Sequence, residues 1–284
     1  MRLIKKNPLK GNLKSRMRDK VRGKIHILPN LVTASNLIMG VYAILLALFT
    51  LSSGDFSQKR MSQAAMYVFY GMIFDVFDGF VARLTKTSSH FGMELDSLAD
   101  LVSFGVAPTV LTYVFILKDA PEPFRKIGVF CCMIYTCCAA LRLARFNAQI
   151  EDEGKTFSGI PTPEAAGVII SYLLLVGHGY LNPEVSYFDR LLQHYVMPIA
   201  PMVLGLLMVA TMRFPAPAKQ IVWKRHAFVY LVLVVILLTA LLRYPGIVLP
   251  VMFVGYLFYG LISWLVRFFL PKKPLEVSTE PEEH

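Results

Sequence analysis

Apolar runs long enough to cross a bilayer recur along the whole chain, and they limit the folds that it can adopt. In a membrane every backbone N–H and C=O must be bonded within the protein, and a helix achieves this inside a single segment of about 20 residues. The sequence therefore predicts an all-α integral membrane protein of about eight transmembrane helices. The runs lie near residues 31–52, 61–82, 97–117, 127–147, 164–181, 195–213, 227–244 and 246–268.

The composition agrees with a membrane location. Hydrophobic residues make up 55% of the 284 residues, charged residues make up only 17%, and the mean hydropathy is +0.53. A soluble domain of this length needs a larger polar surface than such a composition supplies. We therefore expect the apolar runs to face lipid as well as one another.

Positive charge is concentrated at the N-terminus. Residues 1–26 carry ten Lys and Arg residues and one acid, which accounts for nearly all of the net charge of +10. Leu13, Met17, Val21 and Ile25 recur every four residues and so share one helical face. Residues 1–27 are thus predicted to form a basic amphipathic helix on anionic lipid, the alternative being a solvated tail that only sets topology. The sequence lacks the aromatic–basic interleaving that would indicate a nucleic-acid partner.

The basic residues also predict the orientation. With the N-terminus inside, both termini are cytoplasmic and 22 of the 29 Lys and Arg residues lie in the inner loops and termini, in line with the positive-inside rule. The length and the lack of a signal peptide suit the cytoplasmic membrane of a bacterium. The seven basic residues of the outer loops are Lys59, Arg60, Lys118, Arg125, Lys126, Arg190 and Arg243.

Two pairs of aspartates flank the short loop between the second and third apolar runs. Asp75 and Asp78 are three residues apart and Asp96 and Asp100 are four apart, so each pair shares one helical face. We expect the four carboxylates to face one another near the cytoplasmic interface. Their repulsion in a low dielectric would be relieved by Mg²⁺ or Mn²⁺, as one ion or two. From the charges alone, an interhelical ion-pair network and a cation path in a transporter stay open as alternatives.

Two small residues and an arginine follow the first aspartate pair. Gly79 and Ala82 leave room for a ligand to approach the backbone beside the carboxylates. Arg83 carries a permanent positive charge and can bind a diphosphate. The segment therefore suits a ligand that carries a diphosphate.

The spacing D-x2-D-G-x2-A-R-x8-G-x3-D-x3-D, from Asp75 to Asp100, resembles the motif of the CDP-alcohol phosphatidyltransferase family without any departure. The resemblance implies a core of about six membrane helices, usually in a homodimer, that transfers a phosphatidyl group from CDP-diacylglycerol. It also implies that Asp100 is the general base and that two divalent ions occupy the site. The residues that the resemblance assigns to metal are Asp75, Asp78, Asp96 and Asp100. Those that it assigns to CDP-diacylglycerol are Gly79, Ala82, Arg83 and Gly92.

Motifs outside the aspartates resemble the branch of the family that uses L-serine. They are "LPNLVTASNLIMG" (residues 28–40), "LRLARFN" (141–147) and "FSGIPTPEAAG" (157–167), together with "RFPAPAK" (213–219). L-serine is therefore the expected acceptor of the phosphatidyl group. Glycerol 3-phosphate or an inositol phosphate is the alternative, and such an acceptor would need a basic pocket for its own phosphate.

Four polar residues in these outer motifs are further candidates. Arg142 and Arg145 lie about one turn apart and could bind the serine carboxylate or the lipid phosphate, or only anchor the helix at the interface. Asn36 could hydrogen-bond a phosphate of CDP-diacylglycerol or stabilise helix packing. Glu164 could bind the serine ammonium, although a glutamate at an interface needs no such role.

These patterns divide the chain into four predicted parts. Residues 1–27 form the basic N-terminal segment, and residues 28–219 form the CDP-alcohol phosphatidyltransferase core. Residues 220–270 add two transmembrane helices, and residues 271–284 form a polar C-terminal tail. The core would place its active site on the cytoplasmic side of the membrane.

Overall fold

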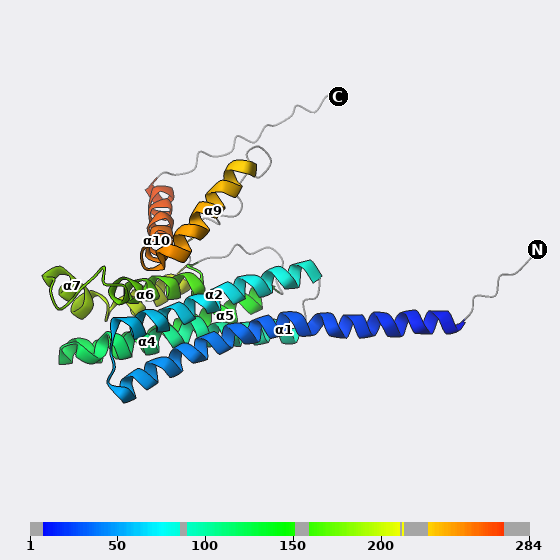
Figure 1. Ribbon diagram of the computed structural model, residues 1–284, viewed down its shortest axis with the longest axis horizontal. Helices are drawn as coiled ribbons and strands as arrows, with labels where there is room; N and C mark the ends of the chain where they lie inside the picture. Colours follow the sequence, from blue (N-terminus) through cyan, green and yellow to red (C-terminus); the bar gives the residue numbers. More distant parts are fainter. Residues whose placement is uncertain (1–7, 86–89, 151–158, 211, 213–226, 270–284) are drawn as a thin grey trace, which may run out of the picture.

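The computed structural model describes residues 8–85, 90–150, 159–210, 212 and 227–269, in which helices joined by short turns and loops are the regular secondary structure and no strand occurs (Figure 1). The all-α prediction is confirmed for this part of the chain. The α-helices are α1 (Pro8–Ser53), α2 (Gln58–Thr85), α3 (His90–Asp100), α4 (Ala107–Phe115), α5 (Glu122–Ile150), α6 (Thr162–Gly177), α7 (Tyr187–Leu191), α8 (Ala200–Val209), α9 (Ala227–Arg243) and α10 (Pro245–Phe269). Two π-helices, η1 (Leu101–Val106) and η3 (Leu192–Val196), and a 3₁₀ turn, η2 (Leu117–Asp119), complete the set.

Five helical segments of the described chain are long and apolar enough to cross a membrane. A sixth span arises if the pair Tyr187–Val196 and Ala200–Val209, bent by 53°, counts as one. The expected total of eight stays a prediction, because α6 has 16 residues and α9 has 17. At about 1.5 Å per residue, such helices fall short of a hydrocarbon core about 30 Å thick. The five segments are Pro29–Ser53, Gln58–Val81, His90–Asp119, Glu122–Ala148 and Pro245–Val266.

Helix α1 joins the basic N-terminal segment to the first membrane span. It runs without a break from Pro8 to Ser53, and its N-terminal part extends beyond the helical bundle (Figure 1). The predicted boundary after residue 27 is therefore not a break in secondary structure. The side chains of residues 8–28, like residues 1–7 and the tail 271–284, lie outside the described part, so the amphipathic contact with lipid stays a prediction.

Small side chains allow α1 and α2 to pack closely against each other. Ala43 and Ala47 of α1 and Ala64 and Ala65 of α2 are fully buried in one hydrophobic cluster. Between membrane helices, where lipid is as apolar as the protein, such close backbone approach is a main source of attraction. This pairing holds together the two helices that carry the first functional groups described below.

Helix α6 packs between α2 and α10. Gly177 at the end of α6 lies against Ser62 near the start of α2, and an added Cβ at Gly177 would be 2.8 Å from the Ser62 Cβ. From this contact, α2 runs forward and α6 runs backward along the bundle (Figure 1). On its other side, Gly167 of α6 lies directly under the ring of Phe253 of α10. Both contacts depend on glycine, because any side chain at either position would collide with its neighbour.

Candidate active site

Three of the four predicted aspartates meet at one point between α2 and α3. Asp75, Asp78 and Asp96 each offer a carboxylate oxygen, and these three oxygens lie within 4.8 Å of one another. Asp78 is buried, and the other two are partly buried. The residues come together because the i, i+3 spacing on α2 places both carboxylates on one face of that helix, where Asp96 of α3 reaches them.

The charges of this cluster require compensation. Two unit charges about 4 Å apart interact by about 4 kcal/mol at the effective dielectric found near protein surfaces. In addition, Oδ1 of Asp96 is buried and has no hydrogen-bond partner among the described residues. A cluster of carboxylate oxygens is the donor set that hard divalent cations such as Mg²⁺ or Mn²⁺ prefer. The residues that are present therefore fit a divalent cation.

Asp100 has a different environment from the other three aspartates. It is buried, it lies outside the three-oxygen cluster, and its Oδ1 accepts a hydrogen bond of 3.0 Å from Nδ2 of Asn36. Asn36 is itself fully buried, and an added Cβ at Gly71 would lie 3.0 Å from its Oδ1. Asn36, for which the sequence suggested a bond to a phosphate of CDP-diacylglycerol or a role in helix packing, thus contacts Asp100 and holds one of its oxygens in place.

A polar row on α1, which the sequence analysis did not single out as a unit, supports the aspartates. The hydroxyl of Thr33 donates to Oδ2 of Asp78 at 2.9 Å. Ser103 of η1 donates to the backbone oxygen of Asn36 at 3.0 Å, and Gly40 provides the space for this approach. Thr33, Asn36 and Gly40 follow an i, i+3, i+7 pattern, which is the signal that places them on one face of α1.

A π-helix begins directly after Asp100. The wider turn of η1 leaves carbonyls that α5 satisfies, since Tyr135 donates to the oxygen of Phe104 at 2.9 Å and Thr136 donates to that of Gly105 at 3.3 Å. Short π-helical stretches are frequent at functional sites because they re-aim the neighbouring side chains. Here the segment fixes the end of α3, and with it Asp100, against α5. No pattern in the sequence pointed to it.

The two arginines of α5 separate in the structure. Arg142 is partly buried, its Nη1 donates to Oγ1 of Thr162 at 2.9 Å, and its charge lies within Coulombic range of Asp100. Its Nε is buried and has no partner among the described residues. Arg145 is exposed. Of the pair, Arg142 is therefore the one that is partly buried and bonded to α6.

Glu164 follows closely on Thr162, in the first turn of α6. Its side chain is partly buried, and Oε1 is shielded from solvent without a hydrogen-bond partner among the described residues. A carboxylate in this state is unfavourable unless a cation or a donor reaches it. The structure thus shows that the predicted candidate Glu164 is partly buried and lies two residues after Thr162, the partner of Arg142.

The residues assigned to CDP-diacylglycerol lie around the cluster as far as the structure describes them. An added Cβ at Gly79 would meet no atom within 4 Å, which leaves open space beside Asp78. Gly92 lies in the first turn of α3 and is partly buried. Ala82 and Arg83 belong to the end of α2, but their side chains lie outside the described part, so their roles stay predictions.

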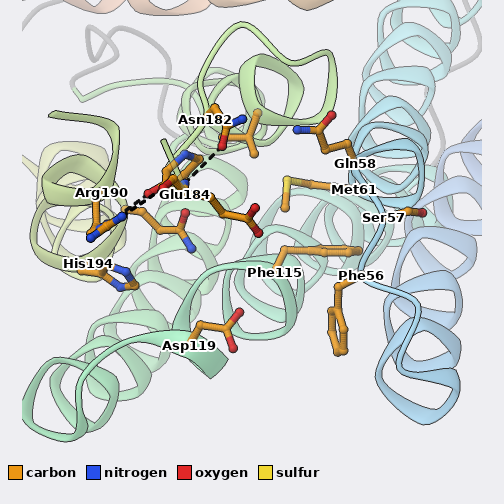
Figure 2. Close-up of a pocket in the computed structure, with 13 residues that line it drawn as sticks. Phe56, Ser57, Gln58, Met61, Phe115, Asp119, Asn182, Glu184, Arg190 and His194 are labelled. Carbon is orange, nitrogen blue, oxygen red and sulfur yellow. Dashed lines mark hydrogen bonds between the residues drawn. The ribbon is translucent and has the colours of Figure 1, made fainter. Parts of the chain in front are cut away.

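A cavity of about 740 Å³ lies at the other end of the bundle. Figure 2 shows its lining, which comes from the start of α2, from Asp119 after α4, from the loop after α6 and from the α7–η3 segment. Arg190 holds that loop by donating to the backbone oxygens of Pro183 and Glu184 at 3.1 and 3.0 Å. Met61 in its wall precedes Asp75 on the same helix by about 21 Å of rise, so the cavity is separate from the carboxylate cluster.

Taken together, the apolar helices and the oxygen-rich cluster define a helical membrane protein with an acidic cluster that could bind a divalent cation. Residues 26–207 match the family model of CDP-alcohol phosphatidyltransferase, which is well over half of the chain. The chain therefore belongs to the CDP-alcohol phosphatidyltransferase family.

Curated relatives in the family cover most of the chain. A CDP-diacylglycerol–serine O-phosphatidyltransferase of Helicobacter pylori is 35% identical over 85% of this chain and 92% of its own length. Enzymes with the same name from Bacillus subtilis and Methanocaldococcus jannaschii are each 33% identical. These two matches cover 72% and 85% of this chain and 94% and 96% of the relatives.

Proposed function

We propose that this protein transfers the phosphatidyl group of CDP-diacylglycerol to the hydroxyl of L-serine, which yields phosphatidylserine and CMP. The observation that carries the proposal is the convergence of Asp75, Asp78 and Asp96, all from the complete family motif, on one point beside open space at Gly79. Serine as the acceptor is supported by relatives of that name that match most of the chain. The outer motifs at 28–40, 141–147 and 157–167 agree with this choice.

The acidic cluster is proposed to hold Mg²⁺ or Mn²⁺. Asp75, Asp78 and Asp96 would supply one oxygen each, and by family resemblance Asp100 completes the set for two ions. A divalent cation there would offset the charge of the diphosphate and stabilise the attacking and leaving oxygens. Arg83 and Gly79 are proposed to bind the CDP moiety, with Ala82 and Gly92 beside them.

Asp100 is proposed to act as the general base. Asn36 holds one of its oxygens, so the other can take the proton of the serine hydroxyl as that oxygen attacks phosphorus. The new serine O–P bond forms while the bond to the CMP oxygen breaks, in a single displacement. No covalent phosphatidyl-enzyme is needed, and radiolabelled lipid is expected not to remain on the denatured protein.

The wider setting is proposed from charge and family. The distribution of Lys and Arg supports cytoplasmic termini and a cytoplasmic active site, and it suits the cytoplasmic membrane of a bacterium with eight spans. The basic residues before residue 27 would favour anionic lipid. Family resemblance supports a homodimer.

The test is an assay of the purified protein in mixed micelles with CDP-diacylglycerol, Mg²⁺ or Mn²⁺ and labelled L-serine. We expect lipid-soluble label and CMP release, with Asp100→Asn lowering the rate by a factor of about 10²–10⁴, the usual contribution of a general base. Asp119→Asn changes an exposed aspartate near the far cavity in the same way and should leave the rate unaltered. CMP release with glycerol 3-phosphate or an inositol phosphate, but not with serine, would contradict the choice of acceptor.

A further inference from the structure

Two polar atoms, on partly buried side chains of opposite charge, are shielded from solvent and have unfilled hydrogen-bonding capacity. They are Nε of Arg142 on α5 and Oε1 of Glu164 on α6, and neither has a partner among the described residues. No ion pair joins the two side chains in that part of the chain. Burial of an unpaired charge is unfavourable, so a ligand atom of opposite charge beside each group would lower the free energy.

The helix register places Glu164 at the depth of the carboxylate cluster. Gly177 of α6 touches Ser62 of α2, and the two helices are antiparallel, so both extend from this contact in the same direction along the bundle (Figure 1). Glu164 precedes Gly177 by thirteen positions, and Asp75 follows Ser62 by the same number. Because both helices rise by about 1.5 Å per residue, the two acids lie at nearly the same level of the bundle.

Arg142 connects this level to Asp100. Its Nη1 bonds to Thr162, close to Glu164 in the chain, and its charge lies within Coulombic range of Asp100. On the side of α6 that faces α10, Phe253 covers Gly167, which lies about one turn after Glu164. Helix α10 thus packs on α6 close to Glu164, whose Oε1 is shielded from solvent.

We propose that Arg142 and Glu164 together recognise the α-amino acid that accepts the phosphatidyl group. Arg142 binds its carboxylate, Glu164 binds its ammonium, and the hydroxyl is left to face Asp100. This assignment rests on the proposed function and extends it to the choice among acceptors. An α-amino acid carries both charges in one small molecule, and it satisfies both buried groups at once, whereas an acceptor that lacks either charge leaves one of them unpaired.

The experiment compares three acceptors in the CMP-release assay: L-serine, 3-hydroxypropanoate, which lacks the ammonium, and ethanolamine, which lacks the carboxylate. For Glu164→Gln we expect the KM for serine to rise at least about 30-fold, with the KM for CDP-diacylglycerol unchanged, since a buried charged hydrogen bond is lost. The advantage of serine over 3-hydroxypropanoate should shrink, while its advantage over ethanolamine should persist. Glu164→Asp, which keeps the charge on a shorter side chain, should recover part of the affinity.

A matched control is Glu184→Gln, which neutralises an exposed glutamate at the far cavity (Figure 2) and should behave as the wild type. The inference is overturned if Glu164→Gln keeps the wild-type KM for serine, or if it loses all acceptors equally. Thermal unfolding and the KM for CDP-diacylglycerol show whether a uniform loss is caused by misfolding. If it is, the same comparison of the three acceptors is made with Glu164→Asp, and an equal loss of all three in a folded Glu164→Asp protein overturns the inference. A wild-type protein that uses no serine would instead refute the proposed function itself, and with it this assignment.

Discussion

At the scale of single residues, the site depends on side chains that hold other side chains. Thr33 bonds to Asp78, Asn36 bonds to Asp100, and Ser103 bonds to the backbone of Asn36. Supporting hydrogen bonds of this kind fix the orientation of a reactive or metal-binding group, and their loss commonly lowers activity by about 10- to 100-fold. Asn36 is thus a positioning residue for Asp100.

Replacement of Asn36 tests this role. Asn36→Ala should lower kcat by about 10- to 100-fold with little change in the KM for CDP-diacylglycerol, because Asp100 loses the donor that orients it. Ser35→Ala is the control, because Ser35 bonds only to the oxygen of Leu31 on its own helix. An unchanged kcat in Asn36→Ala would show that Asn36 serves packing alone.

At the scale of helices, the contact between α1 and η1 depends on one missing side chain. An added Cβ at Gly40 would lie 2.7 Å from the Cα of Ser103, a distance that real Cβ atoms do not tolerate. Gly40→Ala should therefore push α1 from η1, weaken the bond from Ser103 to Asn36 and lower the free energy of unfolding by about 1–3 kcal/mol. Gly255→Ala is the matched control, because nothing lies within 4 Å of that position, and alanine there should be neutral or slightly stabilising. Thermal unfolding in detergent would measure both, and equal melting temperatures would contradict the expectation.

The same helices show which parts of the fold and of the candidate site could be predicted from the sequence. The long apolar runs predicted α2, the α3–α4 span and α5 well, because burial in a bilayer leaves a helix as the available form. The i, i+3 spacing of Asp75 and Asp78, on a helix joined to that of Asp96 by a short loop, predicted that the three carboxylates meet, because helical periodicity places both residues of the pair on one face. The π-helix after Asp100, the distinction between Arg142 and Arg145, and the burial of Glu164 depend on contacts between distant segments. Such contacts leave no local pattern in one sequence.

At the scale of the whole molecule, the proposed binding of a cation by the carboxylate cluster would link stability to that cation. A ligand that binds only the folded state stabilises it by about 2.7 kcal/mol at a hundred times its dissociation constant. Without a cation, the close approach of Asp75, Asp78 and Asp96 is repulsive and opposes folding. The sign of the effect of removing one carboxylate should therefore depend on whether a divalent cation is present.

Asp96→Asn gives this dependence a direct test. In chelator, the variant should melt at a higher temperature than the wild type, because one repulsive charge is gone. In Mg²⁺ or Mn²⁺ the order should reverse, since the wild type gains a bound ion that the variant holds weakly. Asp119→Asn, at the far cavity, should gain as much from the cation as the wild type does. Melting curves of the three proteins with and without cation measure this without any assay of activity, and a wild type that gains no stability from either cation would mean that the cluster does not bind one.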